Sequence, residues 1–324
     1  MSIIQTYQQK IEQALVELNL SDSPVQLYEP IRYILGIGGK RIRPALCLST
    51  CHYFGTNGDN ALNAALALEV FHNFTLLHDD IMDSASIRRN MPTVHTKWDV
   101  NTAILSGDAM MIKACLLILK TPAEYQSKVM DLFFQTAMEV CEGQQFDMNF
   151  EKQIDVTPFD YLEMIRLKTA VLIAASFKIG AIIGGASDTD AAQMYLFGQN
   201  LGMAFQLQDD YLDTYGDLDK FGKAIGGDIL ANKKTFLMVN AIQTSNNKLK
   251  TDLYKLLELD NLDDFTKIQS VINIYNQLGI PNFVKNKIQE FYSAAIENLN
   301  QISLNQDCKS ELKDFASKIV VRDN

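Results

Sequence analysis

The sequence predicts an all-α protein that folds as one large domain over residues 1–324. Long stretches repeat apolar residues every three to four positions, which is the period of a helix and not of a strand. The chain has only seven prolines and 17 glycines, and no proline lies between Pro158 and Pro281. It contains no alternation of strands with helices and no linker rich in Pro, Ser or Gly, so an α/β fold and a second domain are not expected.

Several stretches are apolar nearly all round and rich in Ala and Leu, and we expect them to form buried helices. They are 61–78, 102–119, 128–148 (interrupted at Gly143), 161–182 and 191–213. Breaks between helices are expected at Gly36–Lys40, Arg89–Pro92, Gly184–Asp188 and Tyr215–Asp228. After about residue 245 the chain becomes more polar and amphipathic, which is typical of outer helices packed on a central bundle.

Composition and charge narrow the classes of partner. The formal net charge of −10 disfavours nucleic acid and anionic membranes, so an anionic ligand needs local cations or a metal ion. No run of about 18 uninterrupted apolar residues is present, so we expect no stable membrane insertion. The amino-terminal residues do not resemble a secretory leader. Five scattered cysteines without a CxxC pair indicate free thiols and a cytoplasmic protein.

Two aspartate clusters, HDDIMD and QDDYLD, each place a DDxxD at the end of a long apolar helix. Residues four apart share a helix face, so Asp79 points with Asp83, and Asp209 points with Asp213. Like charges at this spacing repel, and a cation between them removes the penalty. Oxygen ligands without His or Cys suit Mg²⁺. One such cluster alone is typical of a solvated helix end, whereas two copies with the same spacing indicate a metal site.

A third acid and several cations accompany these clusters. Asp147 in GQQFD also ends an apolar helix, although alone it would be typical of a surface charge. Lys168 lies in the otherwise apolar MIRLKTAVLIAASF, where a lone cation needs a reason. The other cations near the acids are Lys40, Arg41, Arg43, Arg88, Arg89, Lys223, Lys233 and Lys234. Because Mg²⁺ and Arg or Lys side chains jointly bind polyphosphates, the set predicts a diphosphate ligand.

Other reaction classes lack their motifs. The GGK element is not a P-loop, because Ile34 stands where the first P-loop glycine belongs and Arg41 replaces the required Ser or Thr. The sequence contains no HExxH, no GxSxG and no GxGxxG after a strand, which disfavours zinc hydrolase, serine hydrolase and dinucleotide chemistry.

The ordered motifs GGKRIRP, HDDIMD with RR, GQQFD, LKT, and FQLQDDYLD with FGK and NKKT resemble those of the trans-isoprenyl diphosphate synthases. They span about residues 36–235. The resemblance implies an antiparallel helical bundle of the isoprenoid-synthase type around a deep central cavity, a homodimer, and three Mg²⁺ ions. It implies a prenyltransferase of isoprenoid biosynthesis. Such an enzyme condenses isopentenyl diphosphate head-to-tail with dimethylallyl, geranyl or farnesyl diphosphate.

The resemblance also assigns residues, and it places the two aspartate clusters across the cavity mouth from each other. The metal ligands are Asp79, Asp83, Asp147, Asp209 and Asp213. The residues that hold isopentenyl diphosphate are Lys40, Arg43, His72 and Arg89. Those around the allylic diphosphate and the carbocation are Arg88, Lys168, Thr169, Gln206, Lys223 and Lys233. One departure is Asn90, where the family has RRG, and we expect it to change a loop glycine and not the chemistry.

The implied mechanism divides the work among these residues. Lys168, Lys223 and Lys233 share with Mg²⁺ the neutralisation of the leaving diphosphate. The carbocation is stabilised by the side-chain oxygens of Thr169 and Gln206 and by the Lys168 carbonyl. No side-chain base is evident, so the proton is expected to leave with the diphosphate.

Product length in the family depends on the residue five positions before the first aspartate, which is Phe74 here, with Phe71 three residues earlier. With no two-residue insertion in the first DDxxD, the pattern resembles the C20 (geranylgeranyl) type, and C15 (farnesyl) or longer products are the alternatives. Ideal helix geometry puts Phe74 about 140° from Asp79, so its role rests on the resemblance. Both phenylalanines could equally be plain core residues.

Two alternatives from other classes remain. A class I terpene cyclase would place Ser or Thr and then Glu at four and eight residues after Asp209, where this chain has Asp213 and Asp217. A non-catalytic synthase subunit or scaffold would have lost motif acids and cations, which this chain retains.

Overall fold

The computed structural model describes residues 2–55, 57–153, 155–216, 226–258 and 262–320. By its internal contacts the chain divides into two compact units. The first comprises Met1–Thr136, Ala175–Tyr195 and Ile302–Leu304, and the second comprises Ala137–Ala174, Leu196–Gln301 and Asn305–Asn324. That the two units form a single domain around a central cavity stays a prediction.

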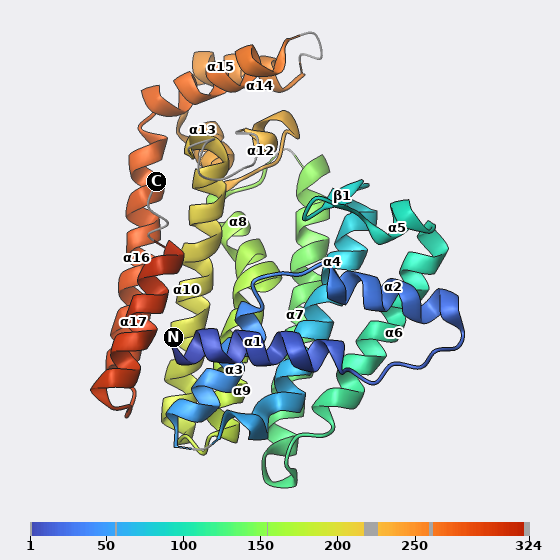
Figure 1. The fold of residues 1–324 in the computed structure, drawn as a ribbon. Coiled ribbons are helices and arrows are strands. Elements are labelled where there is room, and N and C mark those ends of the chain that lie inside the picture. The colour runs from blue at the N-terminus through green and yellow to red at the C-terminus, as the bar shows by residue number, and fades with distance from the viewer. Residues whose placement is uncertain (1, 56, 154, 217–225, 259–261, 321–324) are drawn as a thin grey trace. The chain divides into compact units, whose positions relative to one another are not determined.

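The predicted all-α fold is confirmed (Figure 1). The first helices are α1 (Ile3–Val16), α2 (Val25–Gly36), α3 (Ile42–Tyr53), the 3₁₀ turn η1 (Gly58–Ala61), α4 (Leu62–Met82), α5 (Val94–Lys97) and α6 (Val100–Ile118). The strands in the described residues are β1 (Ile87–Arg88) and β2 (Met91–Pro92), which pair antiparallel between α4 and α5.

The remaining elements complete the chain. They are α7 (Ala123–Lys152), α8 (Pro158–Ile165), the π segment η2 (Arg166–Ala170), α9 (Val171–Ile183), α10 (Asp188–Tyr215), α12 (Gly227–Leu230), α13 (Phe236–Thr244), α14 (Asn247–Glu258), α15 (Asp264–Gln277), α16 (Ile280–Gln301) and α17 (Gln306–Val320). Helices α7, α9 and α10 contribute residues to both units.

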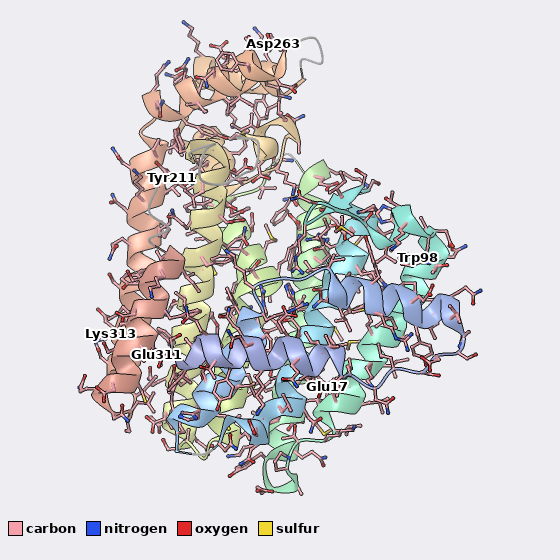
Figure 2. All side chains as sticks on the ribbon, viewed as in Figure 1. Glu17, Trp98, Tyr211, Asp263, Glu311 and Lys313 are labelled. Carbon is pink, nitrogen blue, oxygen red and sulfur yellow. The ribbon has the colours of Figure 1, made fainter. Side chains whose placement is uncertain are left out.

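Polar side chains set the starts of several helices. Asp99 accepts a hydrogen bond from the N–H of Thr102 at the start of α6. Asp263, labelled in Figure 2, does the same for Thr266 at the start of α15. Thr157 begins α8 with a reciprocal capping box and a proline at the first helical position. Each cap satisfies an N–H group that has no partner inside the helix.

Helices occupy all five stretches predicted to be buried, although α6 exposes part of its apolar surface, and three predicted breaks (Gly36–Lys40, Arg89–Pro92 and Gly184–Asp188) lie between the end of one helix and the start of the next. Most of the fourth, Tyr215–Asp228, lies outside the described residues. Two details differ from the sequence pattern. Helix α7 runs through Gly143 without interruption. The stretch 161–182 is not one regular helix, because the π segment η2 separates α8 from α9.

In the first unit, α4 packs along α6 and also contacts α1 and α3 (Figure 1). Its buried residues include Leu68 and Phe71, which are fully excluded from solvent. Helix α6 approaches closely at Gly107, where a Cβ would lie 2.3 Å from Nε2 of His78. A glycine is therefore needed for the His78 ring to lie between the two helices.

In the second unit, α13 is the buried helix, and it contacts α8, α14, α15 and α16. Helices α16 and α17 lie side by side, as Figure 1 shows in orange and red. Both bury one face and expose the other. This arrangement confirms that the polar carboxy-terminal part forms amphipathic helices.

Of the helices described, α6 alone is long and apolar enough to cross a membrane, a length and composition that core helices of soluble proteins share. Apolar side chains on α6 are exposed, among them Leu105 at 60% and Ile112 at 61%. The expectation of no stable membrane insertion stays a prediction.

Gly180 gives a stability prediction. A Cβ at this position of α9 would lie 2.2 Å from the carbonyl oxygen of Cys47 and 2.9 Å from Cβ of Thr50 in α3. We expect Gly180→Ala to lower the free energy of unfolding by roughly 1–3 kcal/mol, because the two helices must separate. Urea denaturation measures the change.

The matched control is Gly36→Ala at the last residue of α2, where a Cβ would meet no atom within 4 Å. This variant should be as stable as the wild type or slightly more stable. If both variants unfolded at the same urea concentration, the close contact between α9 and α3 would be wrong.

Candidate active site

The loop between α2 and α3 carries the cations of GGKRIRP, and one of them has a structural partner. The guanidinium of Arg41 is 3% exposed and forms ion pairs with Glu69 at 2.7 Å and Glu12 at 2.9 Å. Arg41 therefore connects the loop to α4 and α1 through these ion pairs. The cations that the sequence assigned to substrate are its neighbours, Lys40 and Arg43.

Arg43 lies in the first turn of α3, and its Nη1 donates to Nε2 of His72 on α4 at 3.2 Å. Burial, together with the nearby guanidinium of Arg43 and that of Arg89, holds the pKa of His72 well below its ordinary value. His72 is thus neutral and can accept. Among the described atoms, Nε of Arg43 is buried without a hydrogen-bond partner. An unpaired buried N–H is costly, and an oxyanion would satisfy it.

The β1–β2 hairpin places Arg89 against the glycine pair of the same loop. Arg89 and Asn90 form its two-residue turn with φ of 52° and 62°, which is the pattern of a type I′ turn. Asn tolerates positive φ well, so Asn90 can stand where the family has glycine. Nη1 of Arg89 donates to the carbonyl of Gly38. A Cβ on Gly39 would lie 2.7 Å from Nη1 of Arg89, and the φ of +147° at Gly39 favours glycine there.

The first aspartate cluster lies in the last turn of α4, with Asp83 at its carboxyl cap. The middle residue, Asp80, is 2% exposed and accepts from Nε of Arg88 at 2.8 and 2.9 Å and lies 2.7 Å from its Nη2. Burial raises the pKa of Asp80, and Arg88 opposes this effect. Asp79 is 3.7 Å from Nη2 of Arg88, and its side chain is 19% exposed. Arg88 therefore forms its shortest contacts with Asp80, an acid to which the sequence analysis gave no role.

The second cluster, within α10, also combines a buried middle aspartate with accessible outer ones. Asp209 is exposed, whereas Asp210 is 4% exposed. Asp210 accepts from the hydroxyl of Tyr161 and, at 3.0 Å, from Nε2 of Gln206. Burial raises the pKa of Asp210 to about 7. In both clusters the middle acid is held inside the protein, and the outer acids remain accessible.

Asp213 meets a further acid that the sequence analysis missed, Asp228 in GGDIL. Oδ2 of Asp213 accepts from the backbone N–H of Asp228 at 3.0 Å and so holds the start of α12. Burial, with the neighbouring charges of Asp213, Asp209 and Asp147, raises the pKa of Asp228 to about 6. Nζ of Lys233 lies 3.9 Å from Oδ1 of Asp228. The glycine pair before Asp228 was the available signal, because it marks a loop that can return a side chain to α10.

These acids fit a hard divalent cation by their chemistry. They are all carboxylates, and their mutual repulsion adds to burial in raising the pKa of Asp228; a bound cation would relieve this repulsion. In the described part of the chain, no three His, Cys, Asp or Glu side chains are already gathered closely enough to hold a metal ion. The structure thus supplies donors of the right type, and their coordination of Mg²⁺ stays a prediction.

Lys168 lies in the π segment η2, where α7 approaches the backbone very closely. A Cβ on Gly143 would be 2.3 Å from the backbone N of Lys168. One turn farther along α7, Asp147 accepts from Nζ of Lys168 at 2.5 Å. The glycine of GQQFD therefore lets α7 approach η2, and the aspartate of the same motif binds the lysine.

Thr169 and Gln206 also meet. The hydroxyl of Thr169 donates to Oε1 of Gln206 at 3.1 Å. Because Gln206 donates to Asp210, which accepts from Tyr161, four side chains form one hydrogen-bonded chain. Tyr161 and Asp210 are the members that the sequence analysis did not identify.

The remaining predicted residues have these places. Lys223 lies outside the described residues. Lys234 donates to the carbonyl of Phe150 at 2.6 Å near the end of α7, which is a structural role. Phe71 is fully buried, and its ring centroid lies 5.7 Å from that of Phe74. The ring centroids of Phe74 and His78 are 4.8 Å apart.

The predicted residues thus fall into two groups, one in each unit. The first unit holds Lys40, Phe71, His72, Phe74, Asp79, Asp83, Arg43, Arg88 and Arg89. The second holds Asp147, Lys168, Thr169, Gln206, Asp209, Asp213 and Lys233. That the two aspartate clusters face each other stays a prediction.

Comparison with known proteins shows similarity over nearly the whole chain. The family model described as polyprenyl synthetase matches residues 24–276. The geranylgeranyl diphosphate synthase of Methanosarcina mazei is 37% identical over 317 residues, which cover 97% of this chain and 95% of that protein. The geranylfarnesyl diphosphate synthase of Natronomonas pharaonis is 34% identical over 330 residues, covering 96% and 94%. A crystal structure of a geranylgeranyl pyrophosphate synthase matches with a TM-score of 0.94 at 41% identity and covers 100% of both chains.

His72 gives a prediction on the pH dependence of stability. Its folded pKa lies well below the ordinary value of 6.5, so below that pH the unfolded chain binds a proton that the folded chain does not. The stability due to neutral His72 is present above pH 6.5 and is lost as the pH falls toward the lowered folded value.

We expect His72→Gln, which cannot be protonated, to reduce the loss of unfolding free energy between about pH 8 and about pH 5. Urea denaturation at several pH values measures the slope. An unchanged slope in the variant would contradict the neutral, buried state of His72.

Proposed function

The chain belongs to the polyprenyl synthetase family of trans-isoprenyl diphosphate synthases, and from that premise we propose that it condenses isopentenyl diphosphate head-to-tail with an allylic diphosphate. The motif resemblance in the sequence is thereby confirmed at the level of the family. The observation that carries the proposal is the division within both DDxxD clusters. Asp80 and Asp210 are buried against donors, while Asp79, Asp83 and Asp209 remain accessible to a ligand.

The proposed cofactor is Mg²⁺, with three ions, and the proposed ligands are Asp79, Asp83, Asp147, Asp209 and Asp213. When bound, Mg²⁺ neutralises charge on the leaving diphosphate. All of these acids lie toward the carboxyl ends of α4, α7 and α10. The helix dipole disfavours Asp79 and Asp83 at the end of α4, and the outer acids of each DDxxD repel each other at a spacing of four residues, which supports a cationic occupant.

Isopentenyl diphosphate is proposed to bind in the first unit, at Lys40, Arg43, His72 and Arg89. The buried, unpartnered Nε of Arg43 supports an oxyanion at this place. A neutral His72 adds no charge of its own, so it can accept from Arg43 without repelling the guanidinium. Arg89 is held near by its contact with Gly38.

The residues proposed around the allylic diphosphate and the carbocation are Arg88, Lys168, Thr169, Gln206, Lys223 and Lys233. Lys168 and Lys233, with Lys223 from outside the described residues, share the charge of the departing diphosphate. The oxygens of Thr169 and Gln206 stabilise the carbocation, together with the Lys168 carbonyl. The position of Lys168 and Thr169 in a π segment supports this role, because such segments occur often at functional sites. The departing diphosphate takes the proton, since no side-chain base is evident.

The proposed product is C20 geranylgeranyl diphosphate. Relatives at 37% and 36% identity over nearly the whole chain are named geranylgeranyl diphosphate synthase. A relative at 34% identity makes a named C25 product, geranylfarnesyl diphosphate, so a longer product is the second candidate. The packing of Phe74 on Phe71 supports a stop at the shorter length.

We also propose a cytoplasmic homodimer. Exposed apolar side chains of α6, among them Ile104, Leu105, Ile112 and Leu116, would be covered by a second copy of the chain. All five cysteines are free thiols, which is typical of a reducing compartment.

Incubation with labelled isopentenyl diphosphate, Mg²⁺ and each allylic primer tests the activity, and sizing the alcohols after phosphatase treatment gives the product. We expect C20 product with at least one primer. Asp79→Asn and Asp209→Asn should lower kcat by several orders of magnitude, on the order of 10³-fold, because they remove stabilisation of transition-state charge. Asp314→Asn, on the exposed face of α17, is the control and should retain full activity. No diphosphate release with any primer would overturn the proposal in favour of a non-catalytic subunit.

Phe74→Ala tests the chain-length assignment. Removing the ring beside Phe71 should lengthen the product beyond C20 while the rate of the first condensation is kept. The matched control is Phe265→Ala, which removes a ring that is 72% exposed on α15. If product length were the same in both variants, the stop would lie at Phe71 or elsewhere.

A further inference from the structure

We propose that Asp210 and Tyr161 are positioning residues that fix which end of the Gln206 amide faces the reacting centre. Through them, the amide oxygen and not the amide nitrogen is presented toward Thr169 and the allylic carbocation. This inference rests on the proposed function, because it takes the cation to form beside Thr169 and Gln206.

The geometry comes from three contacts within the second unit, where α8 carries Tyr161 and α10 carries Gln206 and Asp210 (Figure 1). Nε2 of Gln206 donates to Oδ1 of Asp210 at 3.0 Å. The hydroxyl of Tyr161 donates to Oδ2 of Asp210. At the other end, Oε1 of Gln206 accepts from the hydroxyl of Thr169 at 3.1 Å.

The direction of these bonds follows from the chemistry of a carboxylate. A carboxyl oxygen that carries no proton only accepts, so Oδ1 of Asp210 binds the NH₂ end of the glutamine and turns the amide oxygen away from itself. Asp210 lies one helical turn after Gln206, which is the spacing at which two side chains on a helix meet. With Asp210 only 4% exposed, water has little access to replace it as the acceptor.

Tyr161 completes the arrangement. It is 5% exposed, and its hydroxyl bonds the carboxylate oxygen that Gln206 does not use. The carboxyl plane of Asp210 is therefore held at both oxygens. A second consequence concerns Thr169, because its proton points to Gln206 and its oxygen lone pairs point elsewhere.

The orientation matters because the two ends of an amide have opposite partial charges. An oxygen beside a developing carbocation stabilises the transition state, whereas an NH₂ group in the same place raises its energy. Such fixed dipoles at a reacting centre are commonly worth about 10²–10³ in kcat. Asp210 then acts on the reaction without touching the substrate.

Asp210→Asn is the direct test, since it changes the acceptor into a group of the same shape that can donate. Its NH₂ group can donate to Oε1 of Gln206 while its oxygen still accepts from Tyr161, and the Gln206 amide then turns round. With the full chain and Mg²⁺, we expect kcat to fall by about 10²-fold while KM for both substrates changes by less than about threefold. Tyr161→Phe should give a smaller loss of kcat, because Asp210 is then held at one oxygen.

The double variant Asp210→Asn with Gln206→Glu separates orientation from structure. A glutamate presents an oxygen at both ends, so it accepts from Asn at position 210 and still offers an oxygen to the cation. We expect kcat to recover to within about tenfold of the wild type. A purely structural role of Asp210 predicts no recovery.

Asp190→Asn is the matched control, because Asp190 is also buried, at 9% exposure, and accepts from Ser187 and from the backbone of Ser303. It should lower thermal stability and leave kcat unchanged. Unchanged kcat in Asp210→Asn, or no recovery in the double variant, overturns the positioning role. Absence of turnover in the wild type would instead overturn the proposed function.

Discussion

The structure depends on how carboxylates crowded near the carboxyl ends of helices are accommodated. Asp79 and Asp80 lie in the last turn of α4, and Asp209 and Asp210 lie near the end of α10. Like charges crowded together repel each other, and the helix dipole also disfavours the acids in the last turn of α4. One acid of each pair is buried and bonded to donors from another element, which leaves its neighbour accessible to an outside cation. The same residue types therefore serve folding and ligand binding within one short motif.

The cations are divided in a similar way. Arg41 forms ion pairs with Glu69 and Glu12, whereas Arg88 pairs with Asp80 and, at a longer distance, with Asp79. Lys234 holds the end of α7, whereas its neighbour Lys233 lies beside Asp228. Adjacent basic residues thus have different functions, because successive side chains point in different directions and meet different partners.

Close contacts between backbones explain several residues that a helical pattern alone does not. Gly143 and Gly180 lie inside helices, where glycine has a low propensity. Each stands where another segment's backbone leaves no room for a Cβ, at η2 for Gly143 and at α3 for Gly180. At Gly143 the close approach also brings Asp147 to Lys168, so a packing requirement and a site contact share one motif.

The sequence by itself determined the all-α fold, most of the helices and the family, because apolar period, glycine and proline positions and motif spacing are local properties of the chain. Only the tertiary structure decided that Asp80 and Asp210 are buried, that Asp228 lies near Asp213, and that Tyr161 reaches Asp210 from 49 residues away. Neighbouring aspartates are chemically identical in the sequence. They differ only in which side of the helix is covered and by what, and those contacts form between elements far apart along the chain.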